Sequence, residues 1–255
     1  TPFRKAFSEK YSPLLFTNTE IALRTFKPEM VEDLKRENEL STEYSQLKAS
    51  AQIEFDGELR TLSQMTPYTT SADDEVRLAA WKAVDAFYMS HAEDFDRIYD
   101  ELTALRTKLG KTLGYENYIE LGYANMGRTD YDAKMVASYR KQVLENVVPV
   151  ANEIIKENGL RIGIENPKFY DQSLEFLDGN PTPKGTKDEL VGKALRMYSE
   201  MSPETKEFFE FMCEHELLDL ESKPGKANGG YCTYIDGYKS PFIFANFNGT
   251  SGDVD

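Results

Sequence analysis

The sequence predicts a mainly α-helical protein, with a small antiparallel β-sheet near the C-terminal end and a short hairpin near residues 53–61. Three observations lead to this class. Apolar residues recur at helical spacing in most long segments, Asp-Gly pairs divide two β-rich segments, and glycine and proline gather in residues 158–186. A chain of 255 residues with 40% hydrophobic content is long enough to bury a core.

Residues 27–50 are predicted to form an amphipathic helix. Pro28 suits a first helical position, because its ring fixes φ at a helical value and the N–H that it lacks would be unpaired there anyway. Met30, Leu34 and Leu47 then recur at roughly helical spacing among charged residues. The pattern predicts one apolar face and a strongly charged outer face.

A β-hairpin is expected directly after this helix. Ile53 and Phe55 precede the pair Asp56-Gly57, and Leu59 follows it. An Asp-Gly pair between two such runs is a strong short-range hairpin signal, since both residues tolerate positive φ.

The next helical pattern opens with Ser71-x-x-Asp74, which has the form of a capping pattern, and it repeats apolar positions at helical spacing. It is too long for one ordinary helix. We therefore expect a break near residues 90–93 and an end near Gly110 or Gly114.

Three more helices follow from the same signals. One covers residues 132–147 and continues past Pro149 with a kink or a restart, because an internal proline removes a backbone donor. Another covers residues 186–200. The last is predicted over residues 202–223, with Ser202 as its cap and a proline in its first turn.

Residues 158–186 are rich in glycine and proline, which predicts a loop. The segment also carries several large apolar side chains that need burial. We expect an ordered loop inside one domain rather than a domain linker, so that residues 1–255 form a single unit.

The segment GGYCTYIDGYKSPFIFANFNG has β-branched and aromatic runs on either side of Asp236-Gly237, with a proline at the start of the second run. This pattern predicts the small antiparallel sheet.

A helix is expected to start right after that sheet. Thr250 or Ser251 is a suitable N-cap, and Asp253 and Asp255 place carboxylates where the dipole of a first helical turn favours negative charge. The sequence also begins at Thr1, in the middle of a pattern. We expect an excerpt whose functional centre lies beyond Asp255.

Composition excludes several classes of function. The formal net charge of −14 and the pI near 4.8 argue against nucleic acid as a partner, because such proteins usually present a basic face. No apolar run approaches the length that crosses a bilayer, so no membrane partner is expected. Cys213 and Cys232 form no disulfide framework, which favours a reducing, cytoplasmic setting.

No complete catalytic constellation is found in the sequence. The two histidines are His91 and His215, and the stretch CEHELLD resembles the start of a zinc-peptidase helix, yet Asp219 stands where the second histidine would be needed. We expect structural or surface roles for both histidines. The many carboxylate pairs are expected on solvated helix faces. Catalytic residues and metal ligands are thus predicted to be absent from these residues.

A family resemblance supplies what the motifs do not. The segment GGYCTYIDGYKSPFIFANFNGTSGDVD resembles the region that precedes the active-site helix in the oligoendopeptidase F and Pz-peptidase group, relatives of thimet oligopeptidase. The stretches FKPEMVEDLKRENEL, LGYANMGRTDY, DGNPTPKG and MSPETKEFFEFM also look like that group. The resemblance covers essentially the whole sequence.

The resemblance implies zinc as cofactor. In that family an H-E-x-x-H helix and a later glutamate bind the metal, and both would lie C-terminal to Asp255. It also implies a helical body around a deep channel that admits short peptides and excludes folded proteins.

The resemblance further implies a role in substrate binding for Gly229, Gly230, Tyr231 and Cys232. Related zinc peptidases hold a peptide as an added strand against a sheet edge, and glycines would let the second backbone come close. The alternative is that the two glycines only shape a turn before a strand.

Two functions therefore remain open. The first is part of a zinc-dependent oligopeptidase that hydrolyses internal bonds of short peptides, with these 255 residues inactive by themselves. The second is a non-catalytic acidic helical scaffold or peptide-binding domain. The sequence does not indicate the oligomeric state.

Overall fold

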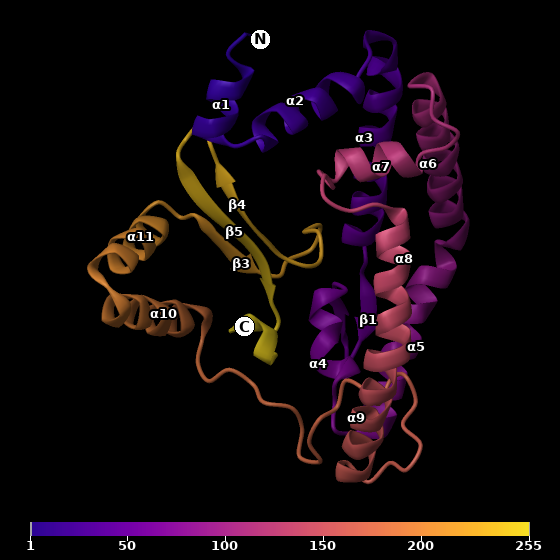
Figure 1. Cartoon of the computed structure of the whole chain (residues 1–255). Coiled ribbons are helices and arrows are strands. Elements are labelled where there is room, and N and C mark those ends of the chain that lie inside the picture. The colour runs from indigo at the N-terminus through magenta and orange to yellow at the C-terminus, as the bar shows by residue number, and fades with distance from the viewer. Residues whose placement is uncertain (1, 255) are drawn as a thin grey trace. The chain divides into compact units, whose positions relative to one another are not determined.

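A computed structural model describes residues 2–254 of the chain (Figure 1). The backbone falls into two compact units, one made of Thr1–Tyr44 and Ala92–Ala151 and the other of Ser45–His91 and Asn152–Asp255. Most of the described residues are helical, which confirms the mainly α class. The single domain over residues 1–255 stays a prediction. None of the described helices is long and apolar enough to span a membrane.

The first unit consists of helices in its described part. In chain order they are α1 (Arg4–Tyr11), α2 (Leu14–Arg24), η1 (Pro28–Met30), α3 (Val31–Ala49), α6 (Ala92–Thr112), α7 (Ile119–Asn125), α8 (Ala133–Gln142) and η3 (Val143–Val147). The boundary between the units falls inside α3, after Tyr44, and inside the helix that follows η3, after Ala151.

Apolar packing and ion pairs hold the first unit together. Arg36 of α3 and Arg97 of α6 both donate to the carboxylate of Glu101, at 2.7 and 3.0 Å. These hydrogen bonds lower the pKa of the Glu101 carboxyl below its ordinary value, because they stabilise the charged form. One buried cluster of the unit consists of three side chains, each 1% exposed: Met30, Leu109 and Leu121.

The predicted interruption near Pro149 is confirmed. A π-helical turn, η3, separates α8 from α9 (Val148–Arg161) and lies directly before the proline. A regular α-helix would leave the carbonyl four residues before a proline without a donor, and a wider turn changes that pairing.

The second unit contains all strands of the described chain. Its elements are β1 (Ile53–Phe55), β2 (Glu58–Arg60), η2 (Ser63–Met65), α4 (Thr66–Thr69), α5 (Asp74–Ser90), α9, α10 (Lys187–Met201), α11 (Pro203–Glu214), β3 (Leu218–Glu221), β4 (Tyr231–Ile235), β5 (Ser240–Phe247) and η4 (Ser251–Asp253).

The hairpin near residues 53–61 is confirmed. β1 pairs antiparallel with β2, and Ile53 lies opposite Arg60. Asp56 and Gly57 adopt φ of 52° and 76°, the left-handed conformation that a tight hairpin turn requires. Ile53 then packs with Met65 and Ala80 in the buried cluster of the second unit.

The break expected near residues 90–93 is also confirmed, because α5 ends at Ser90 and α6 begins at Ala92. The cap of α5 differs from the prediction. Asp73, rather than Ser71, accepts hydrogen bonds from the N–H groups of Glu75 and Val76.

The helix predicted over residues 202–223 is right at its start and wrong at its end. Ser202 caps α11 as expected, but α11 stops at Glu214. Glu216 takes a left-handed φ of 54°, which ends the helix, and Leu218–Glu221 forms strand β3. The apolar residues of this stretch pack in a sheet instead of on a helix face.

The C-terminal sheet is mixed, with the strand order β3-β5-β4. β4 and β5 form the antiparallel pair that the sequence predicts. β3 adds a third strand parallel to β5, which the sequence analysis did not foresee. The central strand is therefore β5, and β3 and β4 are the two edges.

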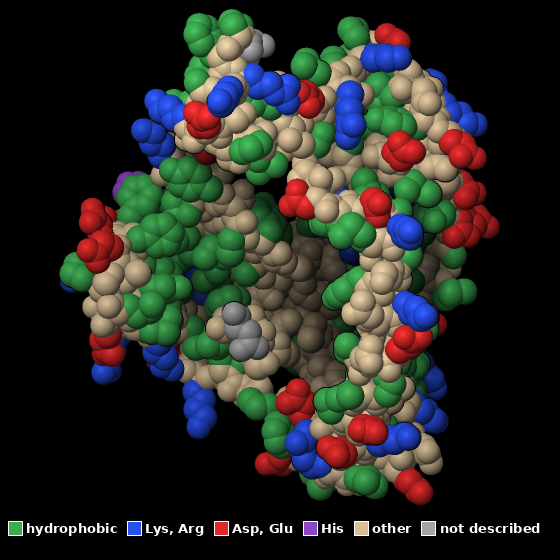
Figure 2. Space-filling view, in the orientation of Figure 1, with side chains coloured by type: hydrophobic (Ala, Val, Ile, Leu, Met, Phe, Trp, Pro, Cys, Tyr) green, Lys and Arg blue, Asp and Glu red, His purple; other side chains and the backbone are tan. Residues whose placement is uncertain are grey.

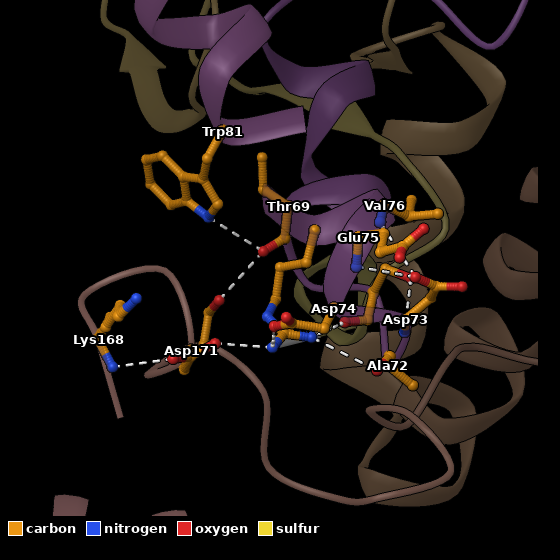
Figure 3. A network of polar contacts seen from close by, with 12 residues as sticks. Thr69, Ala72, Asp73, Asp74, Glu75, Val76, Trp81, Lys168 and Asp171 are labelled. Atoms are coloured by element: carbon orange, nitrogen blue, oxygen red, sulfur yellow. Dashed lines mark hydrogen bonds and ion pairs between the residues drawn. The ribbon is translucent and has the colours of Figure 1, made fainter. Parts of the chain in front are cut away.

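A buried arginine, Arg77, joins the start of α5 to Asp171 in the loop that follows α9. Figure 3 shows Asp74, Asp171 and Thr69 of this polar network. The side chain of Arg77 is 1% exposed, and its Nη2 lies 2.7 Å from a carboxylate oxygen of both Asp74 and Asp171. Trp81 Nε1 and Ser173 Oγ both donate to the carbonyl of Thr69, at 3.2 and 3.3 Å. These contacts order the loop against the helix.

Removing Asp171 should therefore destabilise the second unit. Asp171→Ala leaves the Arg77 charge buried with less compensation, and we expect it to cost about 3 kcal/mol of unfolding free energy. Asp74→Ala is the matched control, because Asp74 pairs with the same guanidinium but its side chain is 66% exposed. We expect it to cost less than about 1 kcal/mol. Urea unfolding of the 255-residue chain, followed by Trp81 fluorescence, measures both, and equal losses would contradict the assignment.

Gly110 and Gly192 should respond in opposite ways to alanine. A Cβ on Gly110 would lie 2.4 Å from the carbonyl oxygen of Asn117, whereas a Cβ on Gly192 in α10 would meet nothing within 4 Å. We expect Gly110→Ala to destabilise by about 2 kcal/mol and Gly192→Ala to stabilise by about 0.5–1 kcal/mol. Urea midpoints provide the measurement, and a tolerated Gly110→Ala would show that the loop after α6 yields easily.

A candidate peptide-binding edge

The strand β4 has one paired edge and one free edge. It pairs with β5 alone, and no other strand of residues 2–254 adjoins it. All five of its residues are exposed. Figure 2 shows hydrophobic side chains exposed on the surface that α10, α11 and this sheet form.

The register identifies which backbone groups of β4 face the free edge. Ile243, the partner of Cys232, donates its N–H to Leu217 at 2.9 Å, which directs its backbone groups away from β4. Tyr234 lies opposite Pro241, which has no N–H. Both are therefore non-hydrogen-bonded pairs, and the N–H and C=O groups of Cys232 and Tyr234 point outward.

We call these outward N–H and C=O groups of Cys232 and Tyr234 the free edge of β4. Residues on either side of Cys232 belong to the alternate set of pairs, and their backbone groups are directed to β5. A peptide added as a fourth strand would thus bond to every second residue of β4.

The chain's own fold already requires the two glycines before β4. Gly229 has a φ of 86°, so it forms a turn that disfavours other residues. A Cβ on Gly230 would lie only 3.0 Å from the carbonyl oxygen of Phe244 in β5. The backbone that approaches Gly230 closely is thus that of β5. The turn interpretation accounts for Gly229, and a role of both glycines in substrate binding stays a prediction.

Asparagine side chains fasten this turn, a role that the sequence analysis missed. Asn246 Nδ2 donates to the carbonyls of Ala227 and Gly229, at 2.9 and 2.7 Å. Asn248 Nδ2 donates to Ser63 at 3.0 Å. Asn246 belongs to β5 and Asn248 follows the end of that strand, and both bond to residues far away in the sequence, so no local pattern indicates their partners.

A polar pocket of about 330 Å³ lies beside the turn. Its wall combines side-chain amides, hydroxyl groups and glycine backbone, which can exchange hydrogen bonds with a neutral polar group. The lining residues are Leu62, Ser63, Thr66, Asn228, Gly229, Gly230, Ala245, Asn246, Asn248 and Gly252.

The stretch after β5 begins a short 3₁₀ turn, η4, at Ser251. Thr250 holds the N-cap position, as predicted, but its hydroxyl makes no cap hydrogen bond and donates to Asn248 Oδ1 at 2.7 Å. Asp253 accepts from the N–H groups of Asn248 and Gly249, at 2.9 and 2.7 Å, and so closes the turn. The predicted role of Asp255 lies outside the described residues.

Neither histidine belongs to a metal site in the described chain. A ring nitrogen of His91 lies 2.9 Å from the carbonyl of Phe87, and one of His215 lies 3.0 Å from that of Phe211. Both cap helix ends, which agrees with the structural role expected for them. Among residues 2–254, no group of three or more His, Cys, Asp or Glu side chains could hold a metal ion.

Comparison with solved structures shows close relatives. A Pz peptidase A solved with an inhibitor is 50% identical to 99% of the chain, with a TM-score of 0.95. A Bacillus anthracis protein assigned as oligoendopeptidase F is 53% identical over the whole chain, with a TM-score of 0.94. Another oligoendopeptidase F structure is 49% identical over the whole chain, with a TM-score of 0.96.

A peptidase structure from Chlamydophila abortus is 17% identical over 97% of the chain and covers 42% of its own length, with a TM-score of 0.55, so it shares the fold alone. No protein-family profile matches the chain, and no curated protein does either. The chain spans 45–47% of the length of the three close relatives. It is therefore homologous to part of oligoendopeptidase F and Pz peptidase A.

Proposed function

We propose that these residues are part of a zinc-dependent oligopeptidase that hydrolyses internal bonds of short peptides. The observation that carries the proposal is the identity of about half of all residues, over the whole chain, to oligoendopeptidase F and Pz peptidase A. Homologues of this identity usually keep the same chemistry when the catalytic residues are present. The expected partners are short peptides, in the cytoplasm, and two free cysteines suit a reducing compartment.

In this proposal the described residues contribute part of the helical body and the strand that receives substrate. The free edge of β4 offers unpaired N–H and C=O groups on Cys232 and Tyr234. Hydrogen bonds to a peptide backbone do not depend on the side chains of the peptide, so the edge suits substrates of varied sequence.

The residues described here do not fit zinc. Zinc needs several converging His, Cys, Asp or Glu ligands, and residues 2–254 contain no such group. The proposal places the H-E-x-x-H helix and the third ligand outside the 255 residues, as the family resemblance implies.

A second function is favoured by the free edge itself. A peptide-binding domain that does not cut its ligand would use the same outward groups of β4. Both functions require peptide binding, and only the first includes hydrolysis. An assay of peptide cleavage therefore separates them.

We expect the complete protein that contains these residues to cleave short peptides and to lose this activity when a chelator removes zinc. Its sequence should carry H-E-x-x-H within about ten residues after Asp255. The 255-residue chain should bind no zinc tightly and show no cleavage, which elemental analysis and a fluorogenic peptide assay measure. A complete protein without the motif would favour the binding domain, and chelator-sensitive cleavage by the short chain would overturn the assignment of ligands.

A peptide on the free edge of β4 should also protect Cys232 from alkylation. Cys232 is exposed, whereas partial burial raises the pKa of the Cys213 thiol and slows its reaction. We expect bound peptide to slow alkylation of Cys232 about tenfold and leave Cys213 unchanged. An N-methylated peptide lacks N–H donors and should protect poorly. Mass spectrometry of the alkylated complete protein reports both thiols, and equal protection by both peptides would argue against strand addition.

A further inference from the structure

A lysine in the loop between β3 and β4 has its charge buried. The side chain of Lys226 is 3% exposed. Its Nζ donates to the carbonyls of Asp219 and Glu221, both at 2.9 Å, and lies 3.1 Å from Asp219 Oδ1. These three oxygens use every N–H donor of the ammonium. A lysine is rarely buried unless it is paired in this way.

The two carbonyls flank an irregularity in the sheet. The register of β3 against β5 shifts between Asp219 and Glu221. Such a shift disrupts the ladder locally, so backbone groups there need other partners. The Lys226 ammonium supplies donors at that point and thereby fixes the loop of residues 222–230 to β3.

Lys226 also contacts a row of side chains that crosses the sheet from β3 to β4. Asp219, Phe244 and Tyr231 are direct neighbours on β3, β5 and β4, so their side chains share one face. The Lys226 Nζ lies 4.6 Å from the centroid of the Phe244 ring, and the Tyr231 ring stacks on Phe244 at 5.1 Å and 9°. The row links the buried charge to the first residue of β4.

The loop has to cross from one edge of the sheet to the other. β3 and β4 are the outer strands, and the loop joins them past β5. Ser222 Oγ lies 3.0 Å from Thr61 Oγ1 at the start of the loop, and Asn246 holds the carbonyl of Gly229 at its end. Lys226 lies between these two anchors. It is the only charged residue of residues 222–230 whose side chain is buried.

We propose that Lys226 is a positioning residue that sets the place of the free edge of β4 and thereby the binding of peptide. It touches no substrate and acts through Phe244, Tyr231 and the loop. The inference rests on the proposed function of that edge.

Lys223 provides a matched control in the same loop. Its Nζ also approaches Asp219 Oδ1, at 3.5 Å, but its side chain is 62% exposed. It therefore shares the charge and the carboxylate partner of Lys226 without the burial, the two carbonyls or the aromatic ring. An effect that came only from the loss of a positive charge would therefore appear when either lysine is replaced.

The test compares Lys226→Met and Lys223→Met in the complete protein, with kcat and KM for a fluorogenic peptide. Displacing the free edge of β4 should weaken the binding of substrate and of transition state equally. Lys226→Met should therefore raise KM about tenfold and leave kcat within about twofold. Lys223→Met should match the wild type. Should Lys226→Met fail to fold, Lys226→Gln keeps two N–H donors and should raise KM by about threefold.

A double variant tests whether Lys226 acts on β4 through Phe244 and Tyr231. If Lys226 acts through the aromatic row, the effect of Lys226→Met on KM should shrink in a Tyr231→Ala background. Hydrogen exchange over residues 231–235 should rise in Lys226→Met without any peptide present. Unchanged exchange, a KM equal to that of Lys223→Met, or a loss confined to kcat would each overturn the inference. A wild-type protein that neither binds nor cleaves peptides would refute the proposed function alone, because the exchange measurement still reports on Lys226.

Discussion

The pairing of β5 with two strands of opposite direction is the constraint on which the candidate site depends. A strand that is paired on both sides has no backbone group left for a ligand, so within this three-stranded sheet a peptide can add only to β3 or β4. The alternation of pairs along β5 then decides which groups of β4 face outward. One proline, Pro241, is tolerated in the central strand because its partner Tyr234 needs no donor from it.

Two buried cations perform similar work at separate places in the second unit. Arg77 and Lys226 each combine a carboxylate with backbone carbonyls that lie five to seven residues earlier in the chain. In a chain with a net charge of −14, most acidic groups are solvated and weakly coupled. The few buried cations therefore contribute more to the free energy of unfolding than the exposed ion pairs do. Removing one partner of such a pair leaves the other charge buried without compensation.

The sequence predicted the parts of the fold that depend on local signals. The hairpin at Asp56-Gly57, the cap at Ser202 and the antiparallel pair around Asp236-Gly237 all follow from residues that are close together in the chain. Strand β3 was missed because its partner β5 begins some twenty residues later, and apolar residues of β3 also fit a helical pattern. The candidate site was predicted only through the family resemblance. Asn246 bonds to a carbonyl 19 residues earlier, and Lys226 reaches two carbonyls of β3 through its long side chain, and no local pattern reveals either contact.

The unpaired edge also bears on how the chain behaves in concentrated solution. Residues Tyr231–Ile235 carry neither charge nor proline, and natural proteins usually place one of these on an open strand to discourage pairing with copies of themselves. The nearest charged side chains, Asp236 and Lys239, belong to the hairpin turn, so the middle of the strand carries no charge that would discourage pairing. A peptide bound along this strand would therefore also block its pairing with a second copy of the chain.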